Sequence, residues 1–282
     1  MDELAVSTVP IYGLIFLFQW IGEVQAEHAA SKEPLEESAI PPNLFFAHQV
    51  TTNACATQAV LSVLLNSSDV KEKLGSVLGE FQSFTASFPP NLKGVAISSA
   101  EEIKTIHNSF ARPEALWEDP SARAAPAEKG EAFHFVAYVP VDGTVYELDG
   151  LQKGPIVVGS IGNDGDWLSV AQQAIQERMT DEHIKFNLMA VTADPRIQWR
   201  TQLEIETDET TRNELAAQLA QHDRLREQWK LENQRRRHSY LPLCIQLFKE
   251  LAKQGNLPEL VSEAKERYAA KKAAAKAGKS TS

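Results

Sequence analysis

The chain has 282 residues, of which 43% are hydrophobic and 23% are charged, and it carries a net charge of −10. This is the composition of a soluble protein, long enough for one substantial core and a smaller second part. Its two cysteines, Cys55 and Cys244, lie in very different surroundings, which excludes a disulfide framework and indicates a reduced, intracellular environment.

The charge is distributed unevenly along the chain. Residues 1–195 contain 11 Lys and Arg against 26 Asp and Glu, a net charge of −15, whereas residues 196–282 contain 17 against 12, a net charge of +5. An acidic first part favours the approach of a basic ligand, and a basic end favours acidic protein or nucleic acid. Solubility alone is an equally good explanation of the charge. The sequence predicts two parts, 1–195 and 196–282, that face different partners.

The first predicted element is a buried strand in the apolar run 9–21. This run follows Asp2 and Glu3 rather than a basic segment, and Gln19 interrupts it, so it differs from a secretory signal. It is also too short to span a bilayer. We therefore expect no membrane partner and a location in the cytoplasm and nucleus. The polar, proline-containing stretch 22–42 is typical of an exposed linker.

Three helices are predicted after the linker. Residues 54–65 form an apolar face, and residues 74–84 place hydrophobic side chains three and four positions apart. A third helix is expected to open at Ser99, because Glu102 completes a Ser-x-x-Glu capping box.

The pattern then changes to that of strands. From Phe133 the chain alternates, turns at Asp142 and Gly143, and returns through residues 144–148, which predicts a hairpin. Residues 184–191 supply one more strand. The first part is therefore predicted to be an α+β domain with helices packed on an antiparallel sheet.

Beyond Pro195 the sequence is typical of helices throughout. A long charged stretch runs to Arg237, a break is expected near Pro242, and an amphipathic helix follows through Leu247 and Leu251 before a Lys- and Ala-rich tail. This pattern predicts an all-helical extension that serves in interaction rather than a second enzyme.

Cys55 is the first candidate for chemistry, because it lies at the predicted start of a helix. Free amides and the positive end of the helix dipole favour thiolate over thiol there, as a nucleophile requires. The alternative is an inert buried cysteine, and the residues that lie near Cys55 in the fold distinguish the two interpretations. Cys244, between Leu243 and Ile245, is predicted to be a buried apolar residue.

The hairpin supplies candidate partners for the cysteine. If Asp142 and Gly143 form the loop, His134 lies opposite Leu151 and diagonal to Asp149, on the same face of the sheet. Diagonal side chains start about 7 to 8 Å apart, within reach of a carboxylate and an imidazole. The carboxylate would hold one ring nitrogen and leave the other to take a thiol proton. Without a nearby cysteine, the pair would be ordinary structural hydrogen bonding.

Gln49 is a candidate for the oxyanion site. It precedes Cys55 by six residues, and its amide could face a tetrahedral oxyanion beside the backbone amide of Cys55. By itself, a loop-surface glutamine is the simpler interpretation.

Five short motifs together resemble the ubiquitin carboxyl-terminal hydrolase family. They are residues 43–50 (NLFFAHQV), 53–59 (NACATQA), 107–112 (HNSFAR), 133–136 (FHFV) and 146–151 (YELDGL). The resemblance implies a papain-like cysteine peptidase fold, hydrolysis at the carboxyl-terminal glycine of ubiquitin, the triad Cys55, His134 and Asp149, and Gln49 in the oxyanion site. It implies no metal or organic cofactor.

The helical end resembles that of the proteasome-associated subtype of the family. Residues 231–242 (LENQRRRHSYLP) and the Lys-rich tail carry this likeness. It implies that residues 196–282 bind the adaptor domain of a proteasomal ubiquitin receptor, and related adaptor domains in chromatin-remodelling complexes. A solvated helix face is the alternative for the basic run. The stretch 112–131 stands where the family has a loop that crosses over the cleft.

The amino end departs from the family pattern. Family members carry further helices and a strand before the segment that matches residues 11–20, whereas nine residues precede Pro10 here. We expect a shortened amino end that exposes a sheet edge. Two alternatives therefore stay open: a catalytically impaired ubiquitin-binding or scaffold protein that acts through its helices, and a papain-like peptidase of unrelated specificity.

Overall fold

The computed structural model describes residues 9–20, 33–71, 74–110, 133–162, 165–179 and 185–279. The chain divides into two compact units, and the change from one to the other falls between Gln228 and Trp229, inside a long helix. The expected boundary at Pro195 instead marks the change from mixed structure to helices, so the division into domains 1–195 and 196–282 stays a prediction.

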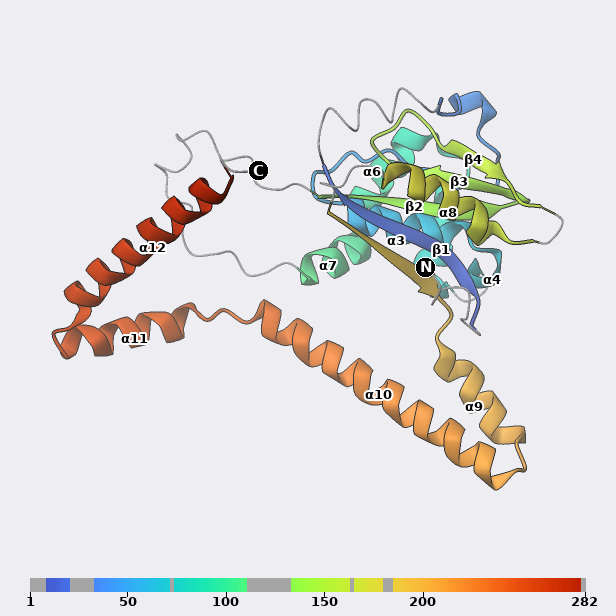
Figure 1. The fold of residues 1–282 in the computed structure, drawn as a ribbon. Helices are drawn as coiled ribbons and strands as arrows, with labels where there is room; N and C mark the ends of the chain where they lie inside the picture. Colours follow the sequence, from blue (N-terminus) through green and yellow to red (C-terminus); the bar gives the residue numbers. More distant parts are fainter. Residues whose placement is uncertain are drawn as a thin grey trace. The chain divides into compact units, whose positions relative to one another are not determined.

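The described part of the chain contains a five-stranded sheet and helices on both sides of it (Figure 1). The strands are β1 (Ile11–Gln19), β2 (Phe133–Val141), β3 (Thr144–Leu148), β4 (Ile156–Ser160) and β5 (Phe186–Thr192). The helices are η1 (Glu37–Ala39), α3 (Cys55–Asn66), α4 (Ser68–Lys71), α5 (Gly75–Thr85), α6 (Pro90–Ser99), α7 (Glu101–Ser109), α8 (Trp167–Arg178), α9 (Pro195–Ile205), α10 (Glu209–Arg237), α11 (Leu241–Lys253) and α12 (Leu257–Lys279).

The sheet has the order β4-β3-β2-β1-β5, and all of its pairings are antiparallel. The apolar run near the amino end forms the interior strand β1, with Leu14, Phe16 and Phe18 almost fully buried. The prediction of an α+β fold with an antiparallel sheet is thus confirmed.

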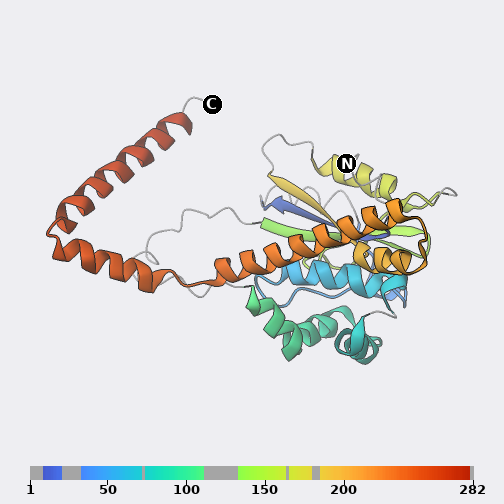
Figure 2. The same cartoon turned by 90° about the horizontal axis from the view of Figure 1, so that it is seen from below.

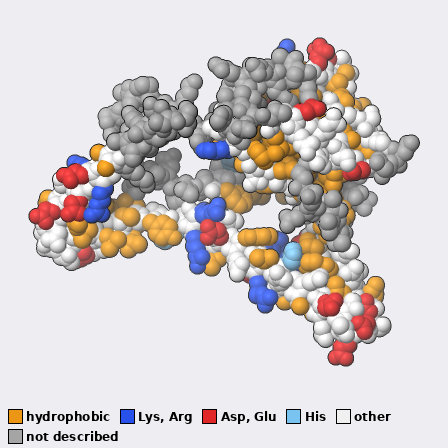
Figure 3. Space-filling view, in the orientation of Figure 1, with side chains coloured by type: hydrophobic (Ala, Val, Ile, Leu, Met, Phe, Trp, Pro, Cys, Tyr) orange, Lys and Arg blue, Asp and Glu red, His pale blue; other side chains and the backbone are white. Residues whose placement is uncertain are grey.

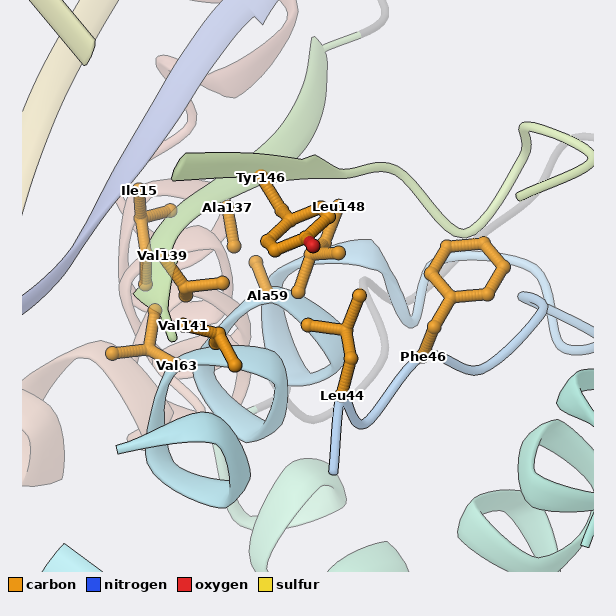
Figure 4. Close-up of a cluster of buried hydrophobic side chains, with 10 residues drawn as sticks. All are labelled: Ile15, Leu44, Phe46, Ala59, Val63, Ala137, Val139, Val141, Tyr146 and Leu148. Carbon is orange, nitrogen blue, oxygen red and sulfur yellow. The ribbon is translucent and has the colours of Figure 1, made fainter. Parts of the chain in front are cut away.

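Helices cover both faces of the sheet. Figures 1 and 2 show α3 on one face and α8 on the other. On the α3 face, Ala59 and Val63 pack with side chains of β1, β2 and β3 (Figure 4). On the other face, Ala171, Ala174 and Ile175 of α8 pack against the opposite side of the same strands. Successive side chains along each strand point to opposite faces of the sheet, so each strand contributes to the core on both sides.

The predicted hairpin register is confirmed. Val141 pairs with Thr144, and the pairing continues to Ala137 and Leu148. Asp142 (φ 46°) and Gly143 (φ 75°) both adopt left-handed conformations, as a two-residue turn of type I′ requires.

The capping box predicted at Ser99 is wrong. Ser99 is the last residue of α6, and α7 begins at Glu101 with Ala100 as its N-cap. The sequence analysis did not predict α6 at all, although Pro90 occupies the first helical position where proline is favoured. Strand β4 and helix α8 were not predicted either. The linker prediction for residues 22–42 lies partly outside the described residues, and its remainder contains η1.

A buried ion pair joins α8 to the sheet. Arg178 Nη2 lies 2.5 Å from Glu147 Oε1, and Tyr138 donates a hydrogen bond of 2.9 Å to Glu147 Oε2. Glu147 has no exposed surface, so its charge is tolerated because both partners satisfy it. Tyr138 lies on β2, the strand that carries His134, and Glu147 lies on β3, which ends one residue before Asp149.

The helices after Pro195 follow the prediction closely. In the first unit, Arg196 links α9 to α10 through Asp223 at 2.7 Å, and Trp199 packs edge-on against His222 at 4.8 Å. The helix break falls at residues 238–240, just before Pro242.

In the second unit, α11 exposes an apolar surface, visible as orange side chains in Figure 3. Its exposed members are Leu243, Cys244, Ile245, Leu247 and Phe248. The prediction that Cys244 is buried is therefore wrong, because α11 has no covering layer among the described residues. No described helix is both long and apolar enough to cross a bilayer.

A substitution in α3 itself tests the packing of the helix that carries Cys55. Leu65 is fully buried beside Phe45 and Phe81. Leu65→Ala should lower the free energy of unfolding by about 2 to 5 kcal/mol, because a cavity forms where the side chain was. Leu92→Ala removes the same atoms at a site that is 47% exposed, and it should cost less than about 0.5 kcal/mol. Urea unfolding followed by circular dichroism measures both, and equal losses would contradict the assigned core.

Candidate active site

Cys55 is the first residue of α3, as predicted. The chain enters the helix through Asn53, which has a left-handed backbone (φ 62°) that asparagine tolerates better than most residues. The N-cap is Ala54, whose methyl group cannot accept a hydrogen bond from the first turn. The amides of this turn are therefore not engaged by a capping side chain and can stabilise negative charge at or near the sulfur.

His134 and Asp149 form the buried pair that the hairpin register predicted. His134 Nε2 donates to Asp149 Oδ1 at 2.7 Å, and the two residues are 4% and 3% exposed. The backbone amide of Leu151 donates to the same carboxylate oxygen at 2.9 Å, which fixes its orientation. With Nε2 engaged, Nδ1 is left for a second partner.

Cys55 lies close enough to His134 for the imidazole to lower the pKa of its thiol, and the backbone of Ala56 and Phe135 acts in the same direction. The structure thus brings together the start of α3 with Cys55, strand β2 with His134, and Asp149, which directly follows β3. Cys55, His134 and Asp149 are arranged as nucleophile, base and orienting acid would be.

Burial and pairing oppose each other in the ionisation of Cys55. Burial raises the pKa of the thiol, but the hydrogen bond and charge of His134 outweigh it and hold the pKa below the usual 9.0. For His134, burial lowers the pKa, whereas Asp149 and Cys55 together raise it from 6.5 to about 9. Both shifts act in the direction of a thiolate–imidazolium pair, because each charged form favours the other.

Two aromatic rings hold the imidazole in place. Trp20 meets His134 edge-on at 5.1 Å between ring centroids, and Phe18 does so at 5.7 Å. Phe18 pairs with His134 across β1 and β2. Sequence reasoning missed both rings, because that register follows from a long connection and not from a short turn.

Gln49 lies near the site but faces its own segment. Its Nε2 donates to the carbonyl of Thr51 at 3.1 Å, and its backbone amide donates to the carbonyl of Gly150 at 2.8 Å. The second bond joins Gln49 to the residue after Asp149. One Nε2 hydrogen is engaged, and the other is available to an incoming oxyanion.

His107 contributes a contact that the sequence analysis did not interpret. Its Nδ1 lies 2.7 Å from Thr57 Oγ1, in the first turn of α3. This bond anchors α7 to the helix that bears Cys55. The segment 112–131, expected to cross over the cleft, lies outside the described residues.

No cluster of three or more His, Cys, Asp or Glu side chains that could hold a metal ion occurs among the described residues.

Comparisons with known proteins place these observations in context. A family model described as ubiquitin carboxyl-terminal hydrolase, family 1, matches residues 1–180, and a second, described as ubiquitin carboxyl-terminal hydrolases, matches residues 212–257.

Among curated proteins, the chain is similar to ubiquitin carboxyl-terminal hydrolase ubh-4 of Caenorhabditis elegans. The two are 38% identical over 277 residues, which covers 94% of this chain and 82% of the relative. Ubiquitin carboxyl-terminal hydrolase 2 of Schizosaccharomyces pombe is 40% identical over 269 residues, covering 93% of this chain and 85% of the relative.

Among solved structures, the fold is similar to that of Trichinella spiralis UCH37 bound to ubiquitin vinyl methyl ester. The TM-score is 0.61 with 34% sequence identity, over 78% of this chain and 82% of that one. A papain-like hydrolase fold is thereby supported from sequence and structure alike.

The paired ionisation of Cys55 and His134 predicts a specific pH dependence of alkylation. With Cys244→Ser as background, the alkylation of Cys55 by iodoacetamide should titrate below the usual thiol pKa of 9.0, because the pKa of Cys55 is lowered. In His134→Ala, burial still raises the pKa but the opposing imidazolium is gone. The apparent pKa of alkylation should rise by at least about one unit, a factor of ten in thiolate at a given pH.

Mass spectrometry of the alkylated Cys55 peptide across pH 5 to pH 10 measures both profiles. Superimposable profiles for the two variants would refute the pairing, provided that circular dichroism shows both to be folded.

Proposed function

The chain belongs to the ubiquitin carboxyl-terminal hydrolase family, and we propose that Cys55, His134 and Asp149 carry out its catalysis. As a member it is a cysteine-type enzyme that hydrolyses bonds at the carboxyl-terminal glycine of ubiquitin. The observation that carries the residue assignment is the buried 2.7 Å bond from His134 to Asp149, with Cys55 near enough for His134 to lower the pKa of its thiol.

The proposed reaction begins with attack of the Cys55 sulfur on the glycine carbonyl. The new carbon–sulfur bond pushes the carbonyl electrons onto oxygen, which gives a tetrahedral oxyanion. Its collapse breaks the carbon–nitrogen bond, and the imidazolium of His134 gives its proton to the departing amine. Asp149 keeps the ring oriented and stabilises its positive charge throughout.

Release of ubiquitin requires a second attack. The now neutral His134 takes a proton from water as the water oxygen attacks the thioester carbon. The second tetrahedral intermediate expels the Cys55 thiolate and leaves ubiquitin with a carboxylic acid, which loses its proton to solvent, while His134 is protonated again. The thiolate–imidazolium pair is thereby restored.

We assign stabilisation of the oxyanion to Gln49 and the backbone amide of Cys55. Two observations support this: Thr51 accepts only one of the two Nε2 hydrogens of Gln49, and the first turn of α3 has no capping side chain. A donor of this kind contributes about 2.7 to 4 kcal/mol to the transition state.

The assembled triad supports the enzymatic reading over a purely scaffolding role. An impaired cleft would not need a carboxylate and an imidazole held buried at hydrogen-bonding distance, since each buried polar group costs free energy unless it is paired. The acidic charge of residues 1–195 also suits attraction of a basic substrate tail.

For the second unit we propose binding to the adaptor domain of a proteasomal ubiquitin receptor, and to a related domain of a chromatin-remodelling complex. Two observations support this. The match to a family model at residues 212–257 covers α11, and α11 exposes Leu247 and Phe248 at 54% and 56%. Such partners would place the protein in the cytoplasm and nucleus, which imaging of the tagged chain would test.

Cys55→Ala should abolish hydrolysis of a ubiquitin-derived fluorogenic substrate, because it removes the attacking atom. A loss of at least about 10⁴-fold in kcat is expected. Cys244→Ala, a matched change at the exposed cysteine, should leave kcat within about twofold. Steady-state kinetics with purified variants measures both. Residual turnover by Cys55→Ala near the level of the unaltered chain would eliminate the assigned nucleophile.

The apolar surface of α11 should dominate adaptor binding. Replacing Leu247 and Phe248 together by Ala should weaken binding by at least about 2 kcal/mol, roughly thirtyfold in Kd. Replacing Gln246 and Lys249 by Ala on the same helix should change it less than about threefold, because polar contacts at the rim contribute little. Calorimetry with the isolated adaptor domain provides the measurement. Equal effects of both pairs would contradict the assigned surface.

A further inference from the structure

We propose that Gln58 is a positioning residue that holds the Gln49 segment against the nucleophile helix. This inference rests on the proposed role of Gln49 as oxyanion donor. The side-chain amide of Gln58 binds the backbone of Ala47 rather than Cys55 or His134.

Gln58 lies in α3, three residues after Cys55, and only 6% of its surface is exposed. Its Nε2 donates to the backbone carbonyl of Ala47. Ala47 is two residues before Gln49 and is itself buried. A single buried side chain thus connects the turn that carries the sulfur to the segment that carries the oxyanion donor.

The loop after Asp149 closes on the same point. Gly150 accepts the backbone hydrogen bond of Gln49 at 2.8 Å. A Cβ atom at Gly150 would lie 2.1 Å from Nε2 of Gln58 and 3.0 Å from Cβ of Gln49. Only a glycine leaves room for the Gln58 amide there. The segments that contain Gln49, Cys55 and Asp149 therefore meet around the side-chain amide of Gln58.

Helix α6 supports the opposite side of the segment. The backbone amide of His48 donates to Pro90 at 2.9 Å, and a Cβ at Gly94 would collide with the His48 carbonyl at 2.0 Å. Thr51 Oγ1 lies 2.7 Å from Ser98 Oγ. Since the Thr51 carbonyl accepts from Gln49 Nε2, this support also orients the amide that would meet the oxyanion.

A second amide on α3 offers a matched control. Asn66, at the far end of the helix, accepts from the Phe45 amide at 2.7 Å and donates to the Phe45 carbonyl at 2.8 Å. Asn66 and Gln58 are both buried and both bind the same segment. Gln58 lies three residues from Cys55, whereas Asn66 is the last residue of the helix. If the role of Gln58 were only structural, replacing either residue would have a similar effect on kcat.

Gln58→Met keeps the length of the side chain and removes the donor. For the fluorogenic ubiquitin substrate, kcat should fall about tenfold or more, because small displacements of a catalytic group are costly. KM should stay within about twofold. Iodoacetamide should alkylate Cys55 in the Cys244→Ser background at an unchanged rate and with an unchanged pH profile, because that reaction forms no oxyanion.

A double-mutant cycle identifies the group through which Gln58 acts. In a Gln49→Ala background, Gln58→Met should reduce kcat by less than about twofold, because the donor that it positions is already absent. Asn66→Leu, assayed well below its melting temperature, should lower stability without lowering kcat. Gly150→Ala should reproduce the kcat defect of Gln58→Met, because the added methyl displaces the Gln58 amide, and it keeps the test available if Gln58→Met fails to fold.

The outcomes separate the two proposals. If Gln49→Ala retains full turnover, the oxyanion assignment fails and the positioning role fails with it. If Gln49→Ala loses turnover while Gln58→Met and Gly150→Ala do not, only the positioning role is overturned. A Gln58→Met defect that is undiminished in the Gln49→Ala background, or that shifts the alkylation profile, would also overturn it.

Discussion

The turn at Asp142 and Gly143 is the constraint on which the active site depends. Both residues adopt left-handed conformations, which admits one register for β2 and β3 and hence one position for Asp149 relative to His134. A slip of one residue would move the histidine to the opposite face of the sheet. The pairing of His134 with Asp149 is therefore a consequence of backbone geometry at the far end of the hairpin.

The ionisation of the site follows from that pairing. A cysteine or a histidine buried alone would be neutral at pH 7, because burial disfavours the charged form of each. Together, with Asp149 behind the ring and backbone hydrogen bonds at the sulfur, the charged forms stabilise each other. In the proposed reaction, one proton transfer from Cys55 to His134 supplies both the nucleophile and the acid for the leaving group.

Sequence reasoning succeeded where short-range rules apply. The hairpin register, the start of α3 at Cys55 and the helices after Pro195 follow from turn chemistry and periodicity, and each is observed. It failed at α6, where Ser99 and Glu102 matched a capping box although the chain was still helical at Ser99. Local motifs compete there with a helix that begins at Pro90.

Contacts set by tertiary structure could not be predicted from the sequence. Trp20 and Phe18 meet His134 because β1 lies beside β2, and no short turn determines that neighbour. Cys244 has apolar neighbours in sequence, yet it is exposed. An apolar pattern predicts that a helix face is buried against something, but it does not say whether the same chain or a partner protein buries it.

The segment 43–51 illustrates why catalysis needs more of the chain than its triad. The segment contains no helix or strand, so no regular backbone pattern fixes the position of Gln49. Contacts with other segments hold it in place. Side-chain amides of α3 bind the backbone of Phe45 and Ala47, and the Gly150 carbonyl accepts the backbone hydrogen bond of Gln49. Helix α6 approaches the segment closely at Gly94. A donor that must already point at the charge before it forms requires such support, because reorientation during the reaction would cost part of the stabilisation. The glycines at positions 94 and 150 permit backbones to approach closely enough for that support to exist.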